Sequence, residues 1–309
     1  MKNVLITGAT GFLGKRLTIF LQEQGVEVTA VGSKQIDLTS TEAIKQIPNN
    51  NYDHIFHLAA WTQAGTFCDV RRGEQWIINQ QINTNMLAWW QKNCPSAKMI
   101  AFGTSVSYAS EHDLVEDKYM QGNPYDKFYA YAMTKRMLLV GLECLQKQFG
   151  MNYLYLIPST IYGPGYHVDD RQKHFIYDLI QKIIRGKMYG EPVVLWGDGE
   201  QRRELIYIDN FIDVMLALNS KASNEIFNLG GGIDYSIKEF ASIICELVGY
   251  DFNNIQYDTN QYVGAKSKIL DVTKYRQVVP TSVVAIEPLQ RGIQATIDWF
   301  YTEKERFLI

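Results

Sequence analysis

Short runs of β-branched and other apolar residues alternate with longer amphipathic stretches through the first half of the chain. The short runs have the length of strands, whereas the longer ones have the length and polarity pattern of helices. This alternation predicts a parallel, doubly wound α/β sheet. We expect strands near residues 4–7, 26–31, 54–58, 98–103 and 153–157, and helices near residues 12–24, 74–93 and 128–149.

The pattern becomes irregular after Pro158. One helix is expected near residues 173–185, together with short strands and terminal helices. This change indicates a smaller α/β lobe in the C-terminal half. We therefore expect one domain over residues 1–160 and a second lobe over residues 161–309, with the chain free to cross back between them.

The composition of the chain mainly excludes certain classes of protein. The chain has 309 residues, of which 46% are hydrophobic, and a net charge of −3, so it has no basic footprint for nucleic acid. No apolar stretch approaches the roughly 18 residues of a membrane span, and the N-terminus already reads as the first strand. The cysteines are scattered without a C-x-x-C pair, which favours a reducing cytoplasm and argues against bound metal or a disulfide framework. They are Cys68, Cys94, Cys144 and Cys245.

Three glycines follow the first predicted strand. Gly8, Gly11 and Gly14 lead from the apolar run at residues 4–7 into a helix. Glycines at such a turn let the backbone approach a pyrophosphate, whose charge is stabilised by the helix dipole. The spacing is G-x-x-G-x-x-G, and a simple tight turn is the alternative. Its place at the start of a strand–helix alternation favours dinucleotide binding.

Tyr131 and Lys135 form the second chemical signal. Four residues apart on a predicted helix, the phenol and the ammonium share one face. A fixed positive charge can lower the pKa of a tyrosine, so we expect Tyr131 to exchange protons near neutral pH. A surface helix also supplies this spacing by chance, and the other motifs must support the interpretation.

Four motifs occur in the order found in extended short-chain dehydrogenases/reductases, the NAD-dependent epimerase/dehydratase family. They are Gly8-x-x-Gly11-x-x-Gly14, His57-Leu-Ala-Ala60, Gly103-Thr-Ser105 and Tyr131-x-x-x-Lys135. The second half most resembles the GDP-L-fucose synthase branch, at residues 193–209, 227–232 and 268–273. The resemblance implies a Rossmann sheet with a substrate lobe and a homodimer or higher homo-oligomer. It also implies NAD(P)-dependent redox chemistry at C4 of a nucleotide sugar, a GDP-linked deoxyhexose or heptose, in surface polysaccharide biosynthesis.

The resemblance also assigns catalytic roles. Tyr131 would exchange a proton with the sugar oxygen, and Lys135 would hold the cofactor ribose and lower the pKa of the tyrosine. The hydroxyl that orients the carbonyl falls on Thr104, and the adjacent Ser105 could share this work. Ordinary hydrogen bonding at the end of a strand is the alternative for these two hydroxyls.

The cofactor is expected to be NAD, with NADP still allowed. The second strand ends in Ser33 and Lys34 without the acid that usually binds the ribose of NAD. However, the two arginines that hold the extra phosphate of NADP in fucose synthases match Thr10 and Ser33. Asp37 resembles the acid that contacts the adenine, although capping or solvation is the alternative. The resemblance extends the expected cofactor site to Phe12, Leu13, Leu38, Leu58, Ala59, Ala60 and Pro158.

Phosphate recognition on the substrate side requires converging cations. Arg203 and Lys268 match such positions, and Arg203 is the stronger candidate because a guanidinium binds phosphate oxygens bidentately. Lys182 also matches, but a lysine on a helix is usually solvated. The remaining expected substrate contacts are Thr160, Trp196, Thr104, Val106 and His174.

One departure from the family pattern changes the expected reaction. Fucose synthases use a cysteine and a histidine to epimerise the carbons beside the ketone. Here the histidine is kept as His174, but Val106 stands at the cysteine position. Valine cannot move a proton, so we favour redox chemistry at C4 alone. A 3,5-epimerase/4-reductase, a 4-epimerase and a non-catalytic dinucleotide sensor are the alternatives.

Overall fold

The computed structural model describes residues 1–167, 171–261, 266–284 and 286–303. It divides into two compact units. Unit 1 comprises residues 1–158, 212–229 and 271–284, and unit 2 comprises residues 159–211, 230–270 and 285–309. The chain therefore passes between the units several times, and its first passage, after Pro158, lies close to the expected boundary at residue 160.

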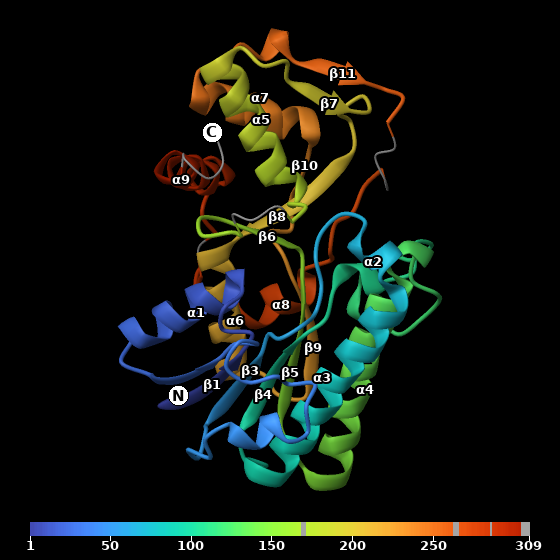
Figure 1. Cartoon of the computed structure of the whole chain (residues 1–309), viewed down its shortest axis with the longest axis vertical. Coiled ribbons are helices and arrows are strands. Elements are labelled where there is room, and N and C mark those ends of the chain that lie inside the picture. Colours follow the sequence, from blue (N-terminus) through green and yellow to red (C-terminus); the bar gives the residue numbers. More distant parts are fainter. Residues whose placement is uncertain (168–170, 262–265, 285, 304–309) are drawn as a thin grey trace. The chain divides into compact units, whose positions relative to one another are not determined.

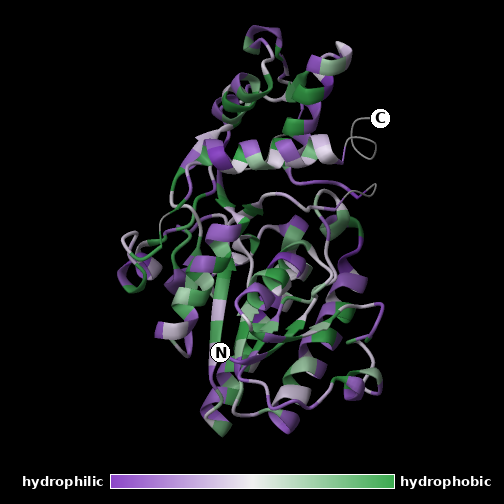
Figure 2. Cartoon of the chain, turned by 90° about the vertical axis from the view of Figure 1, so that its left-hand side faces the viewer, coloured by the Kyte–Doolittle hydropathy of each residue, from purple (hydrophilic) through white to green (hydrophobic). Residues whose placement is uncertain are grey.

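A six-stranded parallel sheet forms the centre of unit 1, in the order β2-β1-β3-β4-β5-β9. Its strands are β1 Asn3–Thr7, β2 Glu27–Val31, β3 His54–His57, β4 Lys98–Phe102, β5 Tyr153–Pro158 and β9 Glu225–Leu229. Most of their residues are apolar and buried, as expected for a parallel sheet covered on both faces. Figure 2 shows this as hydrophobic colouring along the strands of the sheet.

Helices cover both faces of this sheet (Figure 1). α3 and α4 lie side by side along one face, and α1 and α6 lie on the other. The α-helices that carry unit 1 residues are α1 Phe12–Glu23, α2 Phe67–Val70, α3 Arg72–Asn93, α4 Tyr129–Phe149, α6 Ile208–Lys221, which begins in unit 2, and α8 Thr273–Val278. Short 3-10 turns follow two of the strands, η1 Ala43–Gln46 and η2 Ser105–Ser107, and further ones are η3 Glu116–Lys118 and η4 Asp126–Phe128.

The described residues of unit 2 contain two small sheets and three longer helices. β8 lies between β10 and β6 in one sheet, and β7 pairs with β11 in the other (Figure 1). The elements are β6 Thr160–Tyr162, α5 Phe175–Tyr189, β7 Val194–Trp196, β8 Arg202–Tyr207, β10 Asp234–Ser236, α7 Ile237–Val248, η5 Phe252–Asn254, β11 Gln256–Asp258 and α9 Leu289–Thr302. Apolar faces of α5, α7 and α9 share one buried cluster, which gives this unit its own core.

The structure confirms the predicted doubly wound sheet and its first five strands to within a few residues. The sequence pattern did not place β9 in this sheet. β9 is a five-residue strand that pairs with β5 from about 70 residues further along the chain, and local periodicity does not specify such long-range pairing. No helix among the described residues is both long and apolar enough to cross a membrane.

Candidate active site

The glycine turn joins β1 to α1 through close backbone contacts. A Cβ at Gly8 would lie 2.7 Å from the backbone nitrogen of Ala59, and one at Gly14 would lie 2.3 Å from the carbonyl oxygen of Gly8. Gly8 also has a φ of +69°, which favours glycine. Gly11 is the N-cap of α1 and provides no side-chain cap. The N–H groups of the first helical turn, at Phe12, Leu13 and Gly14, therefore remain suited to an anion.

A buried hydrogen-bond network lies directly behind this turn. His57 contacts the hydroxyl of Thr7 at 2.8 Å and the side-chain oxygen of Asn83 at 3.2 Å. Asn83 also donates to the carbonyl of Thr134 on α4. Burial lowers the pKa of His57 to about 4, and the positive charge of Lys135 adds to this effect. The network ties β1, β3, α3 and α4 together beside the loop of Leu58, Ala59 and Ala60.

The end of β2 carries the residues expected near the adenosine ribose. Thr10 packs against Gly32, where an added Cβ would lie 2.5 Å from the Thr10 methyl group. Ser33 and Lys34 follow and are exposed. The Oδ1 atom of Asp37 accepts hydrogen bonds from the backbone N–H and the hydroxyl of Thr39. Asp37 thus makes a local turn contact and is exposed, and the adjacent Leu38 is buried.

Tyr131 and Lys135 lie on the first turns of α4, as their spacing predicted. The Nζ atom of Lys135 is 5.7 Å from the centroid of the Tyr131 ring. Lys135 is only 5% exposed. Both groups belong to unit 1, with the glycine turn and the β3 loop.

The predicted pKa of Tyr131 was wrong in direction. Burial raises the pKa of Tyr131 above its ordinary value, and the nearby Cys68 and Tyr119 raise it further, whereas a hydrogen bond from Thr62 opposes the rise. Burial also lowers the pKa of Lys135 to about 8. Desolvation disfavours both charged forms and outweighs the expected effect of the ammonium. Tyr131 is therefore a protonated phenol at neutral pH.

Thr104, Ser105 and Val106 lie where β4 ends and η2 begins. The Oγ1 atom of Thr104 accepts a hydrogen bond from the backbone N–H of Val106 at 3.4 Å. η2 is fixed to α4, because the hydroxyl of Ser107 donates to the carbonyl of Ala132 at 3.1 Å. The three side chains are only partly buried and are held beside the helix turn that carries Tyr131.

Sequence reasoning missed the side chains that surround Tyr131 from the β3–α3 segment. Thr62 is one of them, and the Nε2 atom of Gln75 lies 3.3 Å from its hydroxyl and 3.4 Å from the sulfur of Cys68. Asn79 holds the same loop by two hydrogen bonds to the backbone of Trp61. Thr62 and Cys68 belong to no recognised motif, so only the fold brings them near Tyr131.

Arg203 and Lys268 both belong to unit 2 and are close enough for the charge of Arg203 to affect Lys268. Both side chains are partly exposed. Burial lowers the pKa of Lys268 to about 8, and the positive charge of Arg203 lowers it further. Two neighbouring cations in one unit raise the local positive potential, which favours an anion.

The other expected substrate residues of unit 2 belong to α5 and its N-cap, β6 and β7. Lys182 pairs with Asp178 at 2.9 Å along α5 and lies 5.9 Å from the centroid of the Trp196 ring. Trp196 is 58% exposed at the end of β7. His174 is exposed at the N-cap of α5, where its carbonyl accepts hydrogen bonds from the backbone N–H groups of Tyr177 and Asp178. Thr160 is partly buried at the start of β6, and Pro158 ends β5 in unit 1.

No group of three or more potential metal-binding side chains is found in the part of the chain that the structure describes.

Known proteins resemble the whole chain. The sequence is 27% identical to GDP-L-fucose synthase from Azorhizobium caulinodans, with 98% of each chain covered. It is also 27% identical to GDP-L-colitose synthase from Yersinia pseudotuberculosis, covering 97% of this chain and 98% of that relative. A solved GDP-L-fucose synthetase from Naegleria fowleri bound to NADP has a TM-score of 0.86 at 23% identity, covering 98% of this chain and 95% of the other. That structure shares the fold.

A model of the NAD dependent epimerase/dehydratase family matches residues 4–230, which include the glycine turn, Tyr131 and Lys135. The chain therefore belongs to the NAD dependent epimerase/dehydratase family.

Proposed function

We propose that this protein is an NAD(P)-dependent enzyme that reduces or oxidises C4 of a nucleotide sugar, with a GDP-linked deoxyhexose or heptose as the favoured substrate. The observation that carries the proposal is the joint placement of the glycine turn, Lys135 and Tyr131 in one unit. The GDP-sugar synthases among its relatives support the substrate class. Synthesis of surface polysaccharide is the process that such a sugar would serve.

The residues of unit 1 fit a nicotinamide dinucleotide. The glycine turn leaves a cradle that a Cβ at Gly8 or Gly14 would fill, and the uncapped start of α1 suits the pyrophosphate. The bound cofactor supplies or accepts the hydride. We favour NAD, because Thr10 and Ser33 provide no guanidinium for an extra phosphate. Lys34 is the nearby cation that would still allow NADP.

Tyr131 suits the role of proton donor in the reductive direction. Its phenol is protonated at neutral pH, and a protonated acid is needed when a ketone oxygen gains charge. Lys135 would hold the cofactor ribose. Thr104, with Ser105 beside it, would orient the ketone oxygen by hydrogen bonding. Arg203 and Lys268 would bind the diphosphate of the substrate, with Lys182, Trp196 and Thr160 around it.

Val106 argues against the complete epimerase-reductase reaction. It lies in the middle of η2, which Ser107 fixes to α4, and its side chain has no exchangeable proton. His174 could act at one neighbouring carbon but cannot replace two proton-transferring groups. A 4-epimerase would use the same tyrosine and cofactor, and it differs by regenerating the cofactor within one turnover.

We expect reduction at C4 with little proton exchange at C3 and C5. Protein, reduced cofactor and a GDP-4-keto-sugar are incubated in deuterated water, and deuterium in the product is located by NMR. The product should carry no more deuterium at C3 and C5 than the free ketone acquires alone. Rapid enzyme-dependent exchange at both carbons would show that another group replaces the missing thiol. Val106→Cys is the converse variant. A gain of proton exchange in this variant would show that Val106 is what prevents exchange in the wild type.

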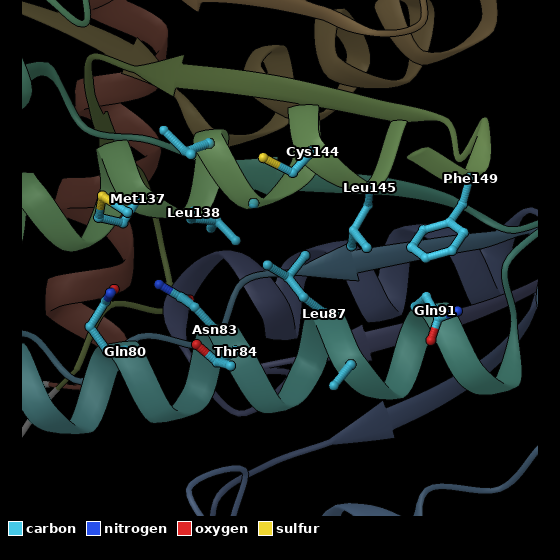
Figure 3. A pocket seen from close by; sticks show the side chains of 13 residues that line it. Gln80, Asn83, Thr84, Leu87, Gln91, Met137, Leu138, Cys144, Leu145 and Phe149 are labelled. Carbon is cyan, nitrogen blue, oxygen red and sulfur yellow. The ribbon is translucent and has the colours of Figure 1, made fainter. Parts of the chain in front are cut away.

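We further propose a homodimer formed through α3 and α4. The two helices line a groove of about 470 Å³ whose walls are mainly apolar (Figure 3). Met137 and Phe149 on α4 are 40% and 49% exposed, and Leu87 on α3 faces Gly141 across the groove. Two of the four charged residues of α4, Lys135 and Arg136, are buried. A face of this kind is typical of a surface covered by a second subunit.

The dimer predicts that a charge in the groove separates the subunits. Met137→Glu should reduce the mass in solution from twice 35.5 kDa to that of one chain, because burying an unpaired carboxylate is costly. Ile19→Glu, at a 49% exposed position on α1, is the matched control and should leave the dimer intact. Analytical ultracentrifugation measures both. A wild-type protein of single-chain mass contradicts this proposal.

A cytoplasmic location is also proposed, since all four cysteines lie in the described residues and are free.

A further inference from the structure

Glu204 is a buried carboxylate on β8 that holds two other segments of unit 2. It is 3% exposed. Its Oε1 atom accepts a hydrogen bond from the backbone N–H of Gly232 at 2.7 Å, and its Oε2 atom accepts one from Leu270 at 3.0 Å. Hydrogen bonds to an ionised acceptor are stronger than those between neutral groups. The carboxylate therefore fastens both segments to the strand.

The glycine turn at residues 230–232 fits closely around this carboxylate. A Cβ at Gly230 would lie 2.2 Å from Oε1 of Glu204, and one at Gly231 would lie 2.7 Å from the carbonyl oxygen of Leu205. Gly232 has a φ of +72°, which favours glycine. The run of three glycines is thus explained by its contact with β8.

The second segment carries Lys268 and is attached to β8 at both ends. The backbone N–H of Arg202 donates to the carbonyl of Lys266 at 2.8 Å, and the other attachment is the bond to Glu204 described above. Lys268 lies midway between the two attachments. Arg203 lies between Arg202 and Glu204, the two residues of β8 that make these attachments. The hydrogen bonds therefore bring the two cations together.

We propose that Glu204 is a positioning residue for the diphosphate site, where its hold on residues 266–270 and on the glycine turn keeps Lys268 beside Arg203. This inference rests on the proposed function, in which these two cations bind the diphosphate of the substrate. Like charges repel each other, so their approach requires a fixed scaffold. Glu204 supplies that scaffold through backbone N–H groups and does not contact the ligand.

A purely electrostatic role for Glu204 predicts the opposite result. If the carboxylate acted only as a negative charge near two cations, its removal would strengthen the binding of an anion. If it positions Lys268, its removal weakens that binding. The sign of the change therefore separates the two roles.

The test is the affinity for GDP of Glu204→Gln and Glu204→Asp, measured by isothermal titration calorimetry on the full chain. Glutamine keeps one acceptor but turns an amide donor toward the other N–H, and aspartate keeps the charge but is too short to reach both segments. Each should weaken GDP binding by about tenfold. Glu200→Gln, which removes an exposed carboxylate paired with Lys238, is the matched control and should bind GDP like the wild type.

Positioning through Lys268 also predicts non-additivity. Lys268→Met should itself weaken GDP binding, and adding Glu204→Gln to it should cause little further loss. Tighter or unchanged GDP binding by folded Glu204→Asp and Glu204→Gln would overturn the inference. It would also be overturned if Glu204→Gln weakened GDP binding equally in the wild type and in Lys268→Met. If Arg203→Ala and Lys268→Met both bind GDP normally, the proposed diphosphate site itself is wrong. Thermal unfolding and cofactor binding report whether each variant is folded.

Discussion

Tyr131→Phe should lower turnover by about 10²–10⁴-fold, the usual contribution of a positioned general acid, while cofactor affinity stays unchanged. The substitution removes one oxygen from a half-buried ring and leaves the glycine turn, His57 and Lys135 in place. Turnover is followed by the absorbance of the reduced cofactor under saturating substrate, and cofactor affinity is followed by fluorescence titration.

Tyr129→Phe is the matched control for this prediction. Tyr129 begins the same helix and is 44% exposed, so its hydroxyl should contribute nothing to turnover. Near-normal turnover of Tyr131→Phe would remove the phenol from the proton-transfer role. A loss of cofactor binding in that variant would show instead that the hydroxyl supports the cofactor site.

Gly14→Ala should weaken cofactor binding by at least about tenfold, or about 1.4 kcal/mol. The added methyl group would lie 2.3 Å from the carbonyl oxygen of Gly8 and 2.8 Å from the Cα of Ala9. Both are backbone atoms, so the turn that we propose as the pyrophosphate site must open to accommodate the methyl group. Cofactor affinity is measured by fluorescence titration, with thermal unfolding measured in parallel.

Gly73→Ala provides the comparison for that variant. Gly73 lies in α3, where an added Cβ would meet nothing within 4 Å. The cofactor affinity of Gly73→Ala should equal that of the wild type, and alanine also favours the helix. If Gly14→Ala binds cofactor as tightly as Gly73→Ala does, the turn is not the pyrophosphate site.

The first half of the fold was predictable because its strands and helices are local patterns. The runs at residues 4–7 and 98–103 are apolar over strand length, and α4 keeps its polarity pattern over 21 residues. The position of β9 depends on pairing with β5, which local pattern does not encode. The spacing of Tyr131 and Lys135 was likewise sufficient to place both on one helix.

The chemical environment of the site was less predictable than its residues. Charge alone suggested a lowered pKa for Tyr131, but burial raises this pKa, and Cys68 and Tyr119 raise it further against the opposing hydrogen bond of Thr62. Glu204 gave no signal in the sequence, because its importance lies in two backbone N–H groups from distant segments. Both features depend on tertiary packing.

Hydride transfer to C4 of the sugar can be followed with an isotope label on the cofactor. Cofactor deuterated at the transferable position of nicotinamide is incubated with the protein and a GDP-4-keto-sugar, and the product is examined by NMR and mass spectrometry. We expect one deuterium per product molecule, located at C4 of the sugar. Product without deuterium at C4, or no reaction with any GDP-, dTDP- or UDP-4-keto-sugar and either cofactor, would contradict it.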